Sequence, residues 1–325
     1  MKGFWEKLPR PIMALAPMAD VTDAAFRRVI AKYGKPDVMW TEFVSADGLC
    51  SVGREVLLRD FWFQENEHPI VAQLFGSNPE NMKEAAHIAA ELGFDGIDIN
   101  MGCPDRNIEK QGAGAAMMRN PKGAQAIIRA AQEGAPSLPI SVKTRIGYGT
   151  NMIDTWIPTL CDAGLVAITI HGRTRKEMSL VPARWDVIGN AVQIVDKLYA
   201  QTPTERPLIL GNGDVTNREE AMQKVSQYGV DGVMIGRGIF GNPWLFSQTV
   251  QKENIPFIEQ LRVMMEHTHL FEELFGGKKS FDTMKKHYKA YINGFDGAKE
   301  LRVRLMATHS ADEVEAVLRE EYPEL

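Results

Sequence analysis

Cys103 stands where a reactive side chain would be useful. In the stretch DINMGCPDRNIEKQGAGAAMM it follows a short apolar run, precedes a proline and opens a polar loop that contains Gly112 and Gly114. A free cysteine is most often a small buried hydrophobic residue. A thiol with a pKa of about 8.5 is, however, mostly protonated at neutral pH and can donate a proton. The position of Cys103 at the end of a strand-like run favours this chemical role, and the two glycines predict a loop that closes over a ligand.

The other cysteines and the histidines form no recognisable ligand set. Cys50 and Cys161 stand in no motif, and the three cysteines make neither a CxxC pair nor a disulfide framework. The histidines are not spaced from the cysteines as zinc ligands are, and His267 and His269 would point in different directions on a helix. We therefore expect no metal site, and a reducing, cytoplasmic setting.

Polar side chains stand at the ends of most other strand-like runs. These are Glu42, Gln73, Asn100, Lys143, Arg145, His171, Asn212, Asp214 and Arg237. Each alone has an ordinary explanation, such as a helix cap, a paired lysine or a buried histidine with satisfied hydrogen bonds. Their joint occurrence at one end of successive runs is hard to explain by packing, and it predicts a functional site at that end.

Two glycine-rich stretches, GNGD at 211–214 and IGRG at 235–238, indicate an anion site. Glycine lets backbone N–H groups approach a phosphate, and Arg237 adds positive charge. The alternative is that these glycines only make tight turns. A phosphorylated ligand bound there would meet Gln73, Lys143 and His171, which suits flavin mononucleotide (FMN) without distinguishing it from other phosphorylated ligands.

The elements that must position these residues alternate between strand and helix. Eight short β-rich runs cover residues 12–18, 38–43, 70–76, 96–102, 140–147, 166–172, 207–214 and 232–238. Helical patterns separate them, with Asn78 as an N-cap before Pro79 and with Thr216 or Asn217 as another. The eight units predict an α/β fold, a (β/α)8 TIM barrel. An open doubly wound sheet is the alternative, but no GxGxxG follows the first run.

After Phe246 the strand pattern stops and only helical patterns follow, with breaks at Gly276-Gly277, 294–297 and Ser310. Ser310 and Glu313 have the spacing of a capping box. We predict a catalytic barrel over residues 1–248 and a small all-helical domain over residues 249–325. Loops after barrel strands carry the chemistry in this fold, so the polar strand ends belong to the first domain.

Composition is that of a globular protein: 325 residues, 44% hydrophobic and 24% charged, with a net charge of −5. No apolar run is long enough for a membrane span, and the first residues lack the apolar segment of a signal peptide. The charge is segregated, since residues 278–304 carry eight basic and three acidic side chains. Lys285, Lys286 and Lys289, next to His287, Tyr288 and Tyr291, fit phosphate contacts with base stacking, although a solvated helix face is equally compatible.

The motif series of the chain resembles that of the tRNA-dihydrouridine synthases. The matching motifs, in order, are APMADVTDAAFR, QLFGSNP, DINMGCP, VKTRIG, IHGRTR, NGDV and MIGRGIFGNPW. They span the whole predicted barrel, and the helical tail is similar to the family's C-terminal RNA-binding domain. The resemblance implies an enzyme with tightly bound FMN that uses NADPH to reduce a uridine of tRNA to 5,6-dihydrouridine. It also implies tRNA as the partner, and we expect a monomer without membrane association.

The resemblance assigns a role to each matching position. Cys103 would be the catalytic acid. FMN would be bound by Pro17, Met18, Ala19, Gln73, Lys143, His171, Asn212, Gly213, Asp214, Gly236 and Arg237. Asn100 and Arg145 would lie near the flavin or the target uracil. The charge pattern adds further candidates for contact with tRNA, which are Arg173 and Arg175 on the barrel rim and Lys285, Lys286 and Arg302 in the basic segment. One departure is that Asp105 and Arg106 follow the Cys-Pro pair, where family members often carry lysine.

The chemistry explains why a thiol acid is needed. Hydride transfer to C6 of uracil leaves negative charge towards C5 and O4, so a positioned acid such as Cys103 must protonate C5. Two other function classes remain open. One is an FMN-dependent oxidoreductase of a free dihydropyrimidine or a dihydroorotate-like substrate, which would not need the basic helical domain. The other is an RNA-binding protein without catalytic activity on a barrel scaffold.

Overall fold

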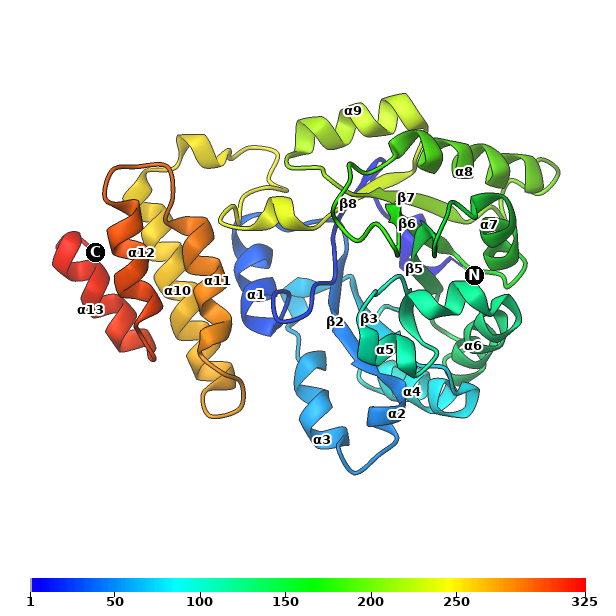
Figure 1. Cartoon of the computed structure of the whole chain (residues 1–325), viewed down its shortest axis with the longest axis horizontal. Coiled ribbons are helices and arrows are strands. Elements are labelled where there is room, and N and C mark those ends of the chain that lie inside the picture. The colour runs from blue at the N-terminus through cyan, green and yellow to red at the C-terminus, as the bar shows by residue number, and fades with distance from the viewer. Residues whose placement is uncertain (1) are drawn as a thin grey trace.

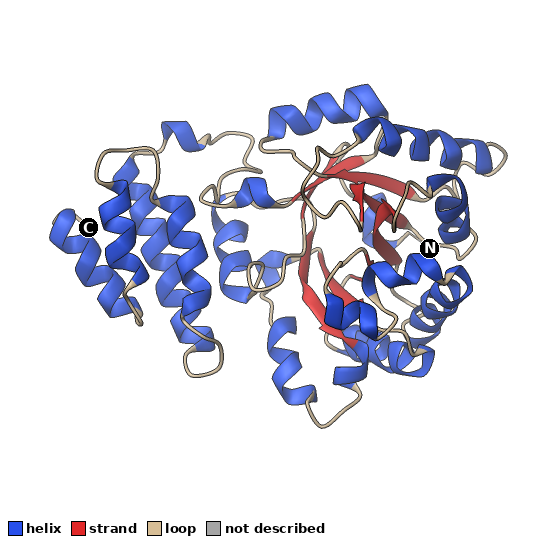
Figure 2. Cartoon of the chain, viewed as in Figure 1, coloured by secondary structure: helices blue, strands red, loops and turns tan. Residues whose placement is uncertain are grey.

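Eight parallel strands close into a barrel in the computed structural model, which describes residues 2–325 (Figures 1 and 2). The strands are β1 (Ile12–Leu15), β2 (Met39–Ser45), β3 (Ile70–Phe75), β4 (Gly96–Met101), β5 (Ile140–Gly147), β6 (Ala167–Thr174), β7 (Leu208–Asn212) and β8 (Gly232–Ile235). Neighbours in sequence pair in parallel from β2 to β8, β8 pairs with β1, and a bridge between Ala14 and Val38 closes the circle. The predicted barrel is confirmed.

The strands form because their apolar runs are buried on both sides. One apolar cluster fills the barrel interior towards the amino ends of the strands, and it includes Ile12, Trp40, Val71 and Leu210. Trp5 and Phe4, from the short 3-10 helix η1 (Gly3–Glu6), pack into this cluster. The interior is therefore filled with apolar side chains towards the amino ends of the strands, which leaves the carboxyl ends for a site.

Helices surround the barrel, and further helices follow it in sequence (Figure 2). The helices around the strands are α1 (Ala24–Tyr33), α2 (Ala46–Leu49), α3 (Arg54–Leu57), α4 (Pro79–Glu91), α5 (Arg106–Lys110), α6 (Pro121–Gly134), α7 (Ile153–Cys161), α8 (Trp185–Leu198) and α9 (Arg218–Tyr228). Short 3-10 helices are η2 (Leu58–Phe61), η3 (Glu65–Glu67), η4 (Gly114–Arg119), η5 (Arg237–Ile239) and η6 (Lys252–Asn254).

The predicted helix ends agree with the structure. Asn78 accepts hydrogen bonds from the N–H groups of Glu80 and Asn81 at the start of α4, and Asn217 rather than Thr216 caps α9. Gly229 ends α9 in the left-handed conformation, with a φ of 70° that favours glycine. The last predicted strand is shorter than expected, because Arg237 begins the turn η5 instead of continuing β8.

The C-terminal helices are α10 (Phe257–Phe275), α11 (Asp282–Tyr291), α12 (Ala298–Met306) and α13 (Ala311–Glu321). They lie together on one side of the barrel next to α1 (Figure 1). They share a hydrophobic cluster of their own, which also takes in Ala24 and Ala25 of α1. One face of α1 therefore belongs to the core of the helical region, while Phe26 and Ile30 pack into the core of the barrel.

No helix within residues 2–325 combines the length and the apolar character needed to cross a membrane.

Candidate functional site

A cavity of about 630 Å³ opens at the carboxyl ends of the strands. Its lining comes from the ends of β1 and β5 to β8 and the loops that follow them, and so from one part of the barrel mouth. Pro17 and Met18 line it after β1, Lys143 and Arg145 on β5, and His171 on β6. Asn212, Gly213, Asp214, Gly236 and Arg237 complete the lining after β7 and β8. The structure thus brings together most of the positions expected to bind a cofactor.

Glycine is required where the loop after β7 approaches the segments that follow β6 and β8. Gly213 has a φ of 128°, and a Cβ at this position would lie 2.6 Å from the Cβ of Ala183. A Cβ on Gly238 would lie 2.9 Å from the carbonyl oxygen of Val215. The indole of Trp185 donates to the carbonyl oxygen of Gly213 at 2.9 Å and fixes this loop. These contacts leave bare backbone at the cavity wall, where N–H groups can approach an anion.

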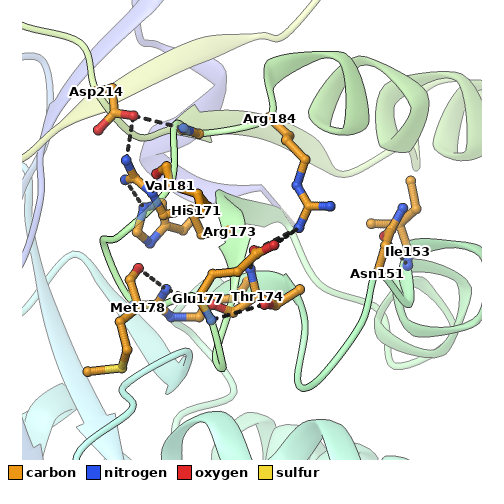
Figure 3. A network of polar contacts seen from close by, with 12 residues as sticks. Asn151, Ile153, His171, Arg173, Thr174, Glu177, Met178, Val181, Arg184 and Asp214 are labelled. Carbon is orange, nitrogen blue, oxygen red and sulfur yellow. Dashed lines mark hydrogen bonds and ion pairs between the residues drawn. The ribbon is translucent and has the colours of Figure 1, made fainter.

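Asp214 joins two arginines at this end of the cavity, of which Figure 3 shows Arg173. Its carboxylate accepts hydrogen bonds from Arg173 and, at 3.0 Å, from Arg237, and it also accepts from the N–H of Ala183. Burial raises the pKa of Asp214, but the bonds from Arg173 and Ala183 outweigh it and lower the pKa. The carboxylate is therefore anionic and repels a phosphate, so its part is to hold the two guanidinium groups.

Arg173 also fixes the state of His171 (Figure 3). An Arg173 guanidinium nitrogen lies 3.2 Å from Nε2 of His171. A guanidinium can only donate, so Nε2 must accept and the ring proton lies on Nδ1. Burial, followed by the charges of Lys143 and Arg145, lowers the pKa of His171 far below its ordinary value. The imidazole is neutral and offers one N–H donor.

Lys143 of β5 is one of the cations that line the cavity. Its Nζ donates to Oδ1 of Asn212 at 3.2 Å, and the amide of Asn212 in turn donates to the carbonyl oxygen of Met234. Burial, aided by the charge of Arg145, lowers the pKa of Lys143 to about 8. The ammonium is still mostly charged at neutral pH and can stabilise negative charge on a ligand.

Cys103 lies next to this cavity and is joined to it through Arg145. The Arg145 Nε donates to the carbonyl oxygen of Gly102 at 2.7 Å, while its Nη1 reaches the carbonyl oxygens of Thr174 and Met178. Cys103 is half-buried, and burial raises the pKa of its thiol above the ordinary value. The thiol is therefore protonated at neutral pH, the state that a proton donor requires.

Asn100 holds the backbone of this loop. Its Oδ1 accepts from the N–H of Gly102 at 3.1 Å and from the N–H of Cys103 at 2.9 Å. Its Nδ2 donates to Oε1 of Gln73. Asn100 is only 7% exposed and its polar atoms are engaged within the protein, so its contact with tRNA stays a prediction.

The segment after Cys103, where we predicted a loop, contains the short helix α5 and the 3-10 helix η4. Asp105 caps the short helix α5 by accepting from the N–H groups of Asn107 and Ile108, which explains this departure from the family motif. Gly114 has a φ of 59°, and a Cβ there would lie 2.8 Å from the carbonyl oxygen of Cys103. The glycines therefore allow the chain to return tightly against Cys103.

Two expected cofactor positions lie outside the cavity lining. Ala19 is exposed, and Gln73 is fully buried with both ends of its amide bonded to protein groups. Sequence reasoning also missed Asp98, which is fully buried and bonded to Gln73 and Ser141. A carboxylate inside the apolar run GIDINM, two residues before Asn100 and so on the same face of the strand, was the signal.

Of the arginines expected at an RNA-facing rim, neither is free at the surface. Arg173 is 3% exposed and lines the cavity, and its donors are used on Asp214, His171 and the carbonyl of Val181, so it lies inside the barrel mouth and not on the outer surface. Arg175 is paired with Glu109 of α5 and lies over the ring of Tyr148. This pair connects the loop after β6 with the segment that follows Cys103.

The basic helix α11 also differs from expectation. His287, Tyr288 and Tyr291 are buried, so the predicted stacking of bases on these rings is wrong. Lys286 donates to the carbonyl oxygen of Asp20 at 2.7 Å and Lys285 pairs with Asp282. On α12, Arg302 donates to the carbonyl oxygen of Ile292. The aromatic rings face inward because they complete the apolar stripe on which the helix packs.

Across residues 2–325 there is no group of three or more His, Cys, Asp or Glu side chains that could hold a metal ion.

The chain matches a known family along almost its whole length. The sequence model described as "Dihydrouridine synthase (Dus)" matches residues 14–325. "Probable tRNA-dihydrouridine synthase 2" of Bacillus subtilis (strain 168) is 40% identical over 321 residues, which cover 98% of this chain and 96% of that protein. "Probable tRNA-dihydrouridine synthase" of Staphylococcus aureus (strain Mu50) is 38% identical over 322 residues, or 98% of this chain and 95% of that protein.

Solved structures with much lower identity share the fold. A variant of NCR from Zymomonas mobilis superposes with a TM-score of 0.50 and 16% identity, covering 78% of this chain and 91% of that one. Morphinone reductase superposes with a TM-score of 0.51 and 13% identity, covering 74% and 85%. At these identities the likeness concerns the barrel architecture alone.

Proposed function

Because this chain belongs to the dihydrouridine synthase family, we propose that it reduces a uridine of tRNA to 5,6-dihydrouridine. The observation that carries the proposal is the half-buried Cys103 thiol, whose raised pKa keeps it protonated beside a cation-lined cavity at the barrel mouth. Reduction of the C5–C6 bond needs one hydride and one proton, so a site that pairs a hydride donor with a protonated acid fits this reaction.

The donor set of the cavity fits FMN. Backbone at Gly213 and Gly236, together with Arg237, would hold the phosphate, since each lies at the end of β7 or β8 and the glycines leave N–H groups accessible. Lys143 and His171 would face the ring system with one cation and one neutral N–H donor. When bound and reduced, the flavin supplies the hydride, and NADPH is the proposed source of those electrons.

The residues of this chain supply the proton and its environment. Cys103 holds a proton on Sγ at neutral pH and transfers it to C5 of the uracil. Arg145 and Lys143 are both within electrostatic reach of that sulfur, and they stabilise negative charge on a pyrimidine placed beside it. Asn100 keeps the Cys103 backbone in place through its bond to the N–H.

We also propose a division of labour along the chain. Residues 1–248 would bind the cofactor and carry out the chemistry, and residues 249–325 would contact the tRNA. The basic character of residues 278–304 supports the second assignment, since phosphate neutralisation dominates affinity for nucleic acids. A target base stacked within folded tRNA must be turned out to reach the barrel, which calls for protein contacts on both sides of it.

The decisive experiment supplies purified protein with NADPH and with tRNA that lacks dihydrouridine. Formation of dihydrouridine at one or a few positions, detected by nucleoside mass spectrometry, is the expected result. The Cys103→Ala variant should reduce its flavin with NADPH at the wild-type rate but form dihydrouridine about 10² to 10⁴ times more slowly, the usual contribution of a general acid. Turnover of free uracil or dihydroorotate without turnover of tRNA would refute the proposal.

A further inference from the structure

Asp98 is a buried carboxylate without an assigned role that lies below the proposed site. It stands in the middle of β4, is completely buried and faces β3 and β5 through two short hydrogen bonds. Gln73 Nε2 donates to its Oδ2 at 2.6 Å, and the Ser141 hydroxyl donates to its Oδ1 at 2.6 Å. An ionisable group in the barrel interior needs a reason, because burying a carboxylate is costly unless it organises its neighbours.

The hydrogen bond to Gln73 is the first of a series that ends at Cys103. Gln73 Nε2 donates to Asp98, and Gln73 Oε1 accepts from Nδ2 of Asn100 at 3.1 Å. Asn100 Oδ1 then accepts from the backbone N–H of Cys103 at 2.9 Å. The side chains of Asp98, Gln73 and Asn100 are all at least nine-tenths buried, so water does not substitute readily for any of them.

The carboxylate of Asp98 fixes the direction of this series at one end, and the N–H groups of Gly102 and Cys103 fix it at the other. A primary amide can be turned by 180° at little cost, so Gln73 and Asn100 do not choose their own orientation. A carboxylate only accepts, so it forces the NH₂ end of Gln73 towards itself and the oxygen of Gln73 towards Asn100. Asn100 must then present its own oxygen to the loop, where the N–H groups of Gly102 and Cys103 need an acceptor.

We propose that Asp98 is a positioning residue for Cys103: its acceptor-only carboxylate sets the orientation of Gln73 and Asn100 and thereby holds the backbone that carries the thiol. The inference depends on the proposed function only for what the thiol does. Without the carboxylate, Gln73 can reverse, and its NH₂ group then meets the NH₂ group of Asn100. A matching reversal of Asn100 would set its own NH₂ group against two N–H donors, so either arrangement leaves donors unpaired and loosens the loop.

The ionisation of Asp98 is compatible with this role. Burial raises the pKa of Asp98 to about 6, against the bonds from Ser141 and Gln73 and the nearby charge of Lys143, which lower it. At neutral pH the group is still mostly a carboxylate and accepts only. Asp98 does not line the cavity and has no contact with the space where a ligand would bind, so it acts through other residues.

The test compares three variants of the full-length, flavin-loaded protein. Asp98→Asn keeps the shape but removes the fixed direction, because an amide offers both a donor and an acceptor. Ser141→Ala is the matched control: it removes a bond of the same length to the same carboxylate without touching the series. The double variant Asp98→Asn, Gln73→Glu restores the direction, since the carboxylate introduced at position 73 accepts from the amide introduced at position 98 on one side and from Asn100 on the other.

Two readouts separate positioning from folding and from the proposed function. One is the rate at which iodoacetamide alkylates Cys103 on the free protein, followed by peptide mass spectrometry. The other is the turnover number for tRNA, with NADPH-driven flavin reduction measured beside it. Asp98→Asn should change the alkylation rate several-fold and lower the turnover number about 10²-fold, as misplacement of a reacting group does, with flavin reduction unchanged. Ser141→Ala should resemble wild type. The turnover number of the double variant should be at least about tenfold higher than that of Asp98→Asn.

Wild-type alkylation and turnover in Asp98→Asn would overturn the inference. So would a double variant that folds and binds flavin normally yet recovers nothing. Failure of the proposed function has a different signature: the wild-type protein would then form no dihydrouridine in tRNA, while the alkylation rates of the Asp98 variants would still report the position of the thiol.

Discussion

At the scale of single residues, the site keeps most of its cations bound to fixed partners. Arg173 is held by Asp214, Arg145 by backbone carbonyls and Lys143 by Asn212. Arg237 is the exception, since its side chain is 66% exposed and its contact is a 3.0 Å bond to Asp214. A preorganised set of cations needs little rearrangement when an anionic ligand arrives, whereas Arg237 is free to adjust to it.

Replacing Arg237 by alanine should weaken FMN binding about tenfold. A charge-assisted bond to phosphate is worth about 1.5 to 3 kcal/mol, and the exposure of Arg237 places it at the lower end. Flavin fluorescence titration of the apoprotein measures the affinity. Arg237→Lys, which retains the charge, is the control and should lose less. Equal affinity of the alanine variant and wild type would remove Arg237 from the phosphate site.

Residue types could be predicted from the sequence better than residue roles. Glycines and cations at the strand ends identified the cavity, because the barrel places all strand ends at one mouth. The partner of each side chain depends on neighbours that are distant in sequence. Asp214 therefore looked like a phosphate ligand although it binds Arg173 of β6 and Arg237 of η5, and Gln73 looked accessible although its side chain is bonded to Asp98 of β4.

At the scale of elements, the segment from Cys103 to Arg119 folds back compactly against Cys103. Asp105 begins α5, and the chain then reverses so that the N–H of Ala115 donates to the carbonyl oxygen of Cys103 at 2.9 Å. Gly112 and Gly114 both have positive φ, but only Gly114 lies against Cys103. This tight return keeps the thiol in one place, as a proton donor to a single carbon atom requires.

Alanine substitution at the two glycines should separate these effects. Gly112→Ala adds only the conformational cost of a positive φ, about 1 to 2 kcal/mol, because its Cβ would meet nothing closer than 3.5 Å. Gly114→Ala adds contacts of 2.8 Å with the Cys103 carbonyl and with Ile108, which cost about 1 to 3 kcal/mol more. Thermal unfolding should rank wild type, Gly112→Ala and Gly114→Ala in falling stability, and only Gly114→Ala should slow tRNA reduction strongly. Equal losses in both variants would contradict this.

The sequence of α11 contains the spacing of a buried helix face, which the prediction of base stacking did not take into account. Met284, His287, Tyr288 and Tyr291 have the i, i+3, i+4, i+7 spacing of a buried stripe, and all four are buried. The neighbouring lysines suggested instead that the aromatic rings of this helix are exposed and stack on RNA bases. The number of strands could be predicted correctly because it follows from the hydrophobic pattern of the chain alone. Which face of a single helix is buried depends on the elements that pack against it.

At the scale of the molecule, the barrel and the C-terminal helices are locked together. Lys279 pairs with Glu42 and Asp60 of the barrel at 2.8 and 2.7 Å. Burial lowers the pKa of Lys279, but the two carboxylates outweigh it and raise the pKa. Glu42 also accepts from the N–H of Asp20, so the loop after β1 that carries Met18 to the cavity is tied to this junction. Removal of residues 249–325 would therefore expose α1 and disturb the cavity, and point variants are the sounder test of RNA binding.

The interface between the barrel and the C-terminal helices should lose stability in mild acid, because two histidines are buried within it. His267 and His287 pack against Phe26, and none of their four ring nitrogens has a hydrogen-bond partner among residues 2–325. Burial lowers the pKa of His267 to about 3 and that of His287, which also faces His267 and Lys286, well below 6.5. The unfolded chain takes up these protons below pH 6.5 and the folded chain does not, so stability is full above that pH and falls as the pH falls.

Denaturant unfolding at pH 7.5 and 5.5 measures this loss. Two such histidines remove about 3 kcal/mol of unfolding free energy at pH 5.5, or about 1.4 kcal/mol each. The double variant His267→Phe, His287→Phe should lose correspondingly less over the same interval, whatever its stability at pH 7.5. A pH dependence identical to that of wild type would show that the two rings are already protonated or hydrated in the folded protein.

The last prediction concerns where the helical region meets RNA. Lys285 and Lys286 are engaged by Asp282 and Asp20, whereas Lys289, on the same helix, is exposed and pairs with no carboxylate of residues 2–325. Lys289 is therefore the α11 cation best placed to neutralise a phosphate. Lys289→Gln should weaken tRNA binding and lower the slope of log affinity against log salt by about 1, the signature of one lost phosphate contact.

The matched control is Lys197→Gln, which removes the same charge near the end of α8, at the end of the barrel opposite the cavity. If both variants bind tRNA with the wild-type slope, then α11 is a structural helix of the junction, and the RNA must be held by the barrel mouth alone.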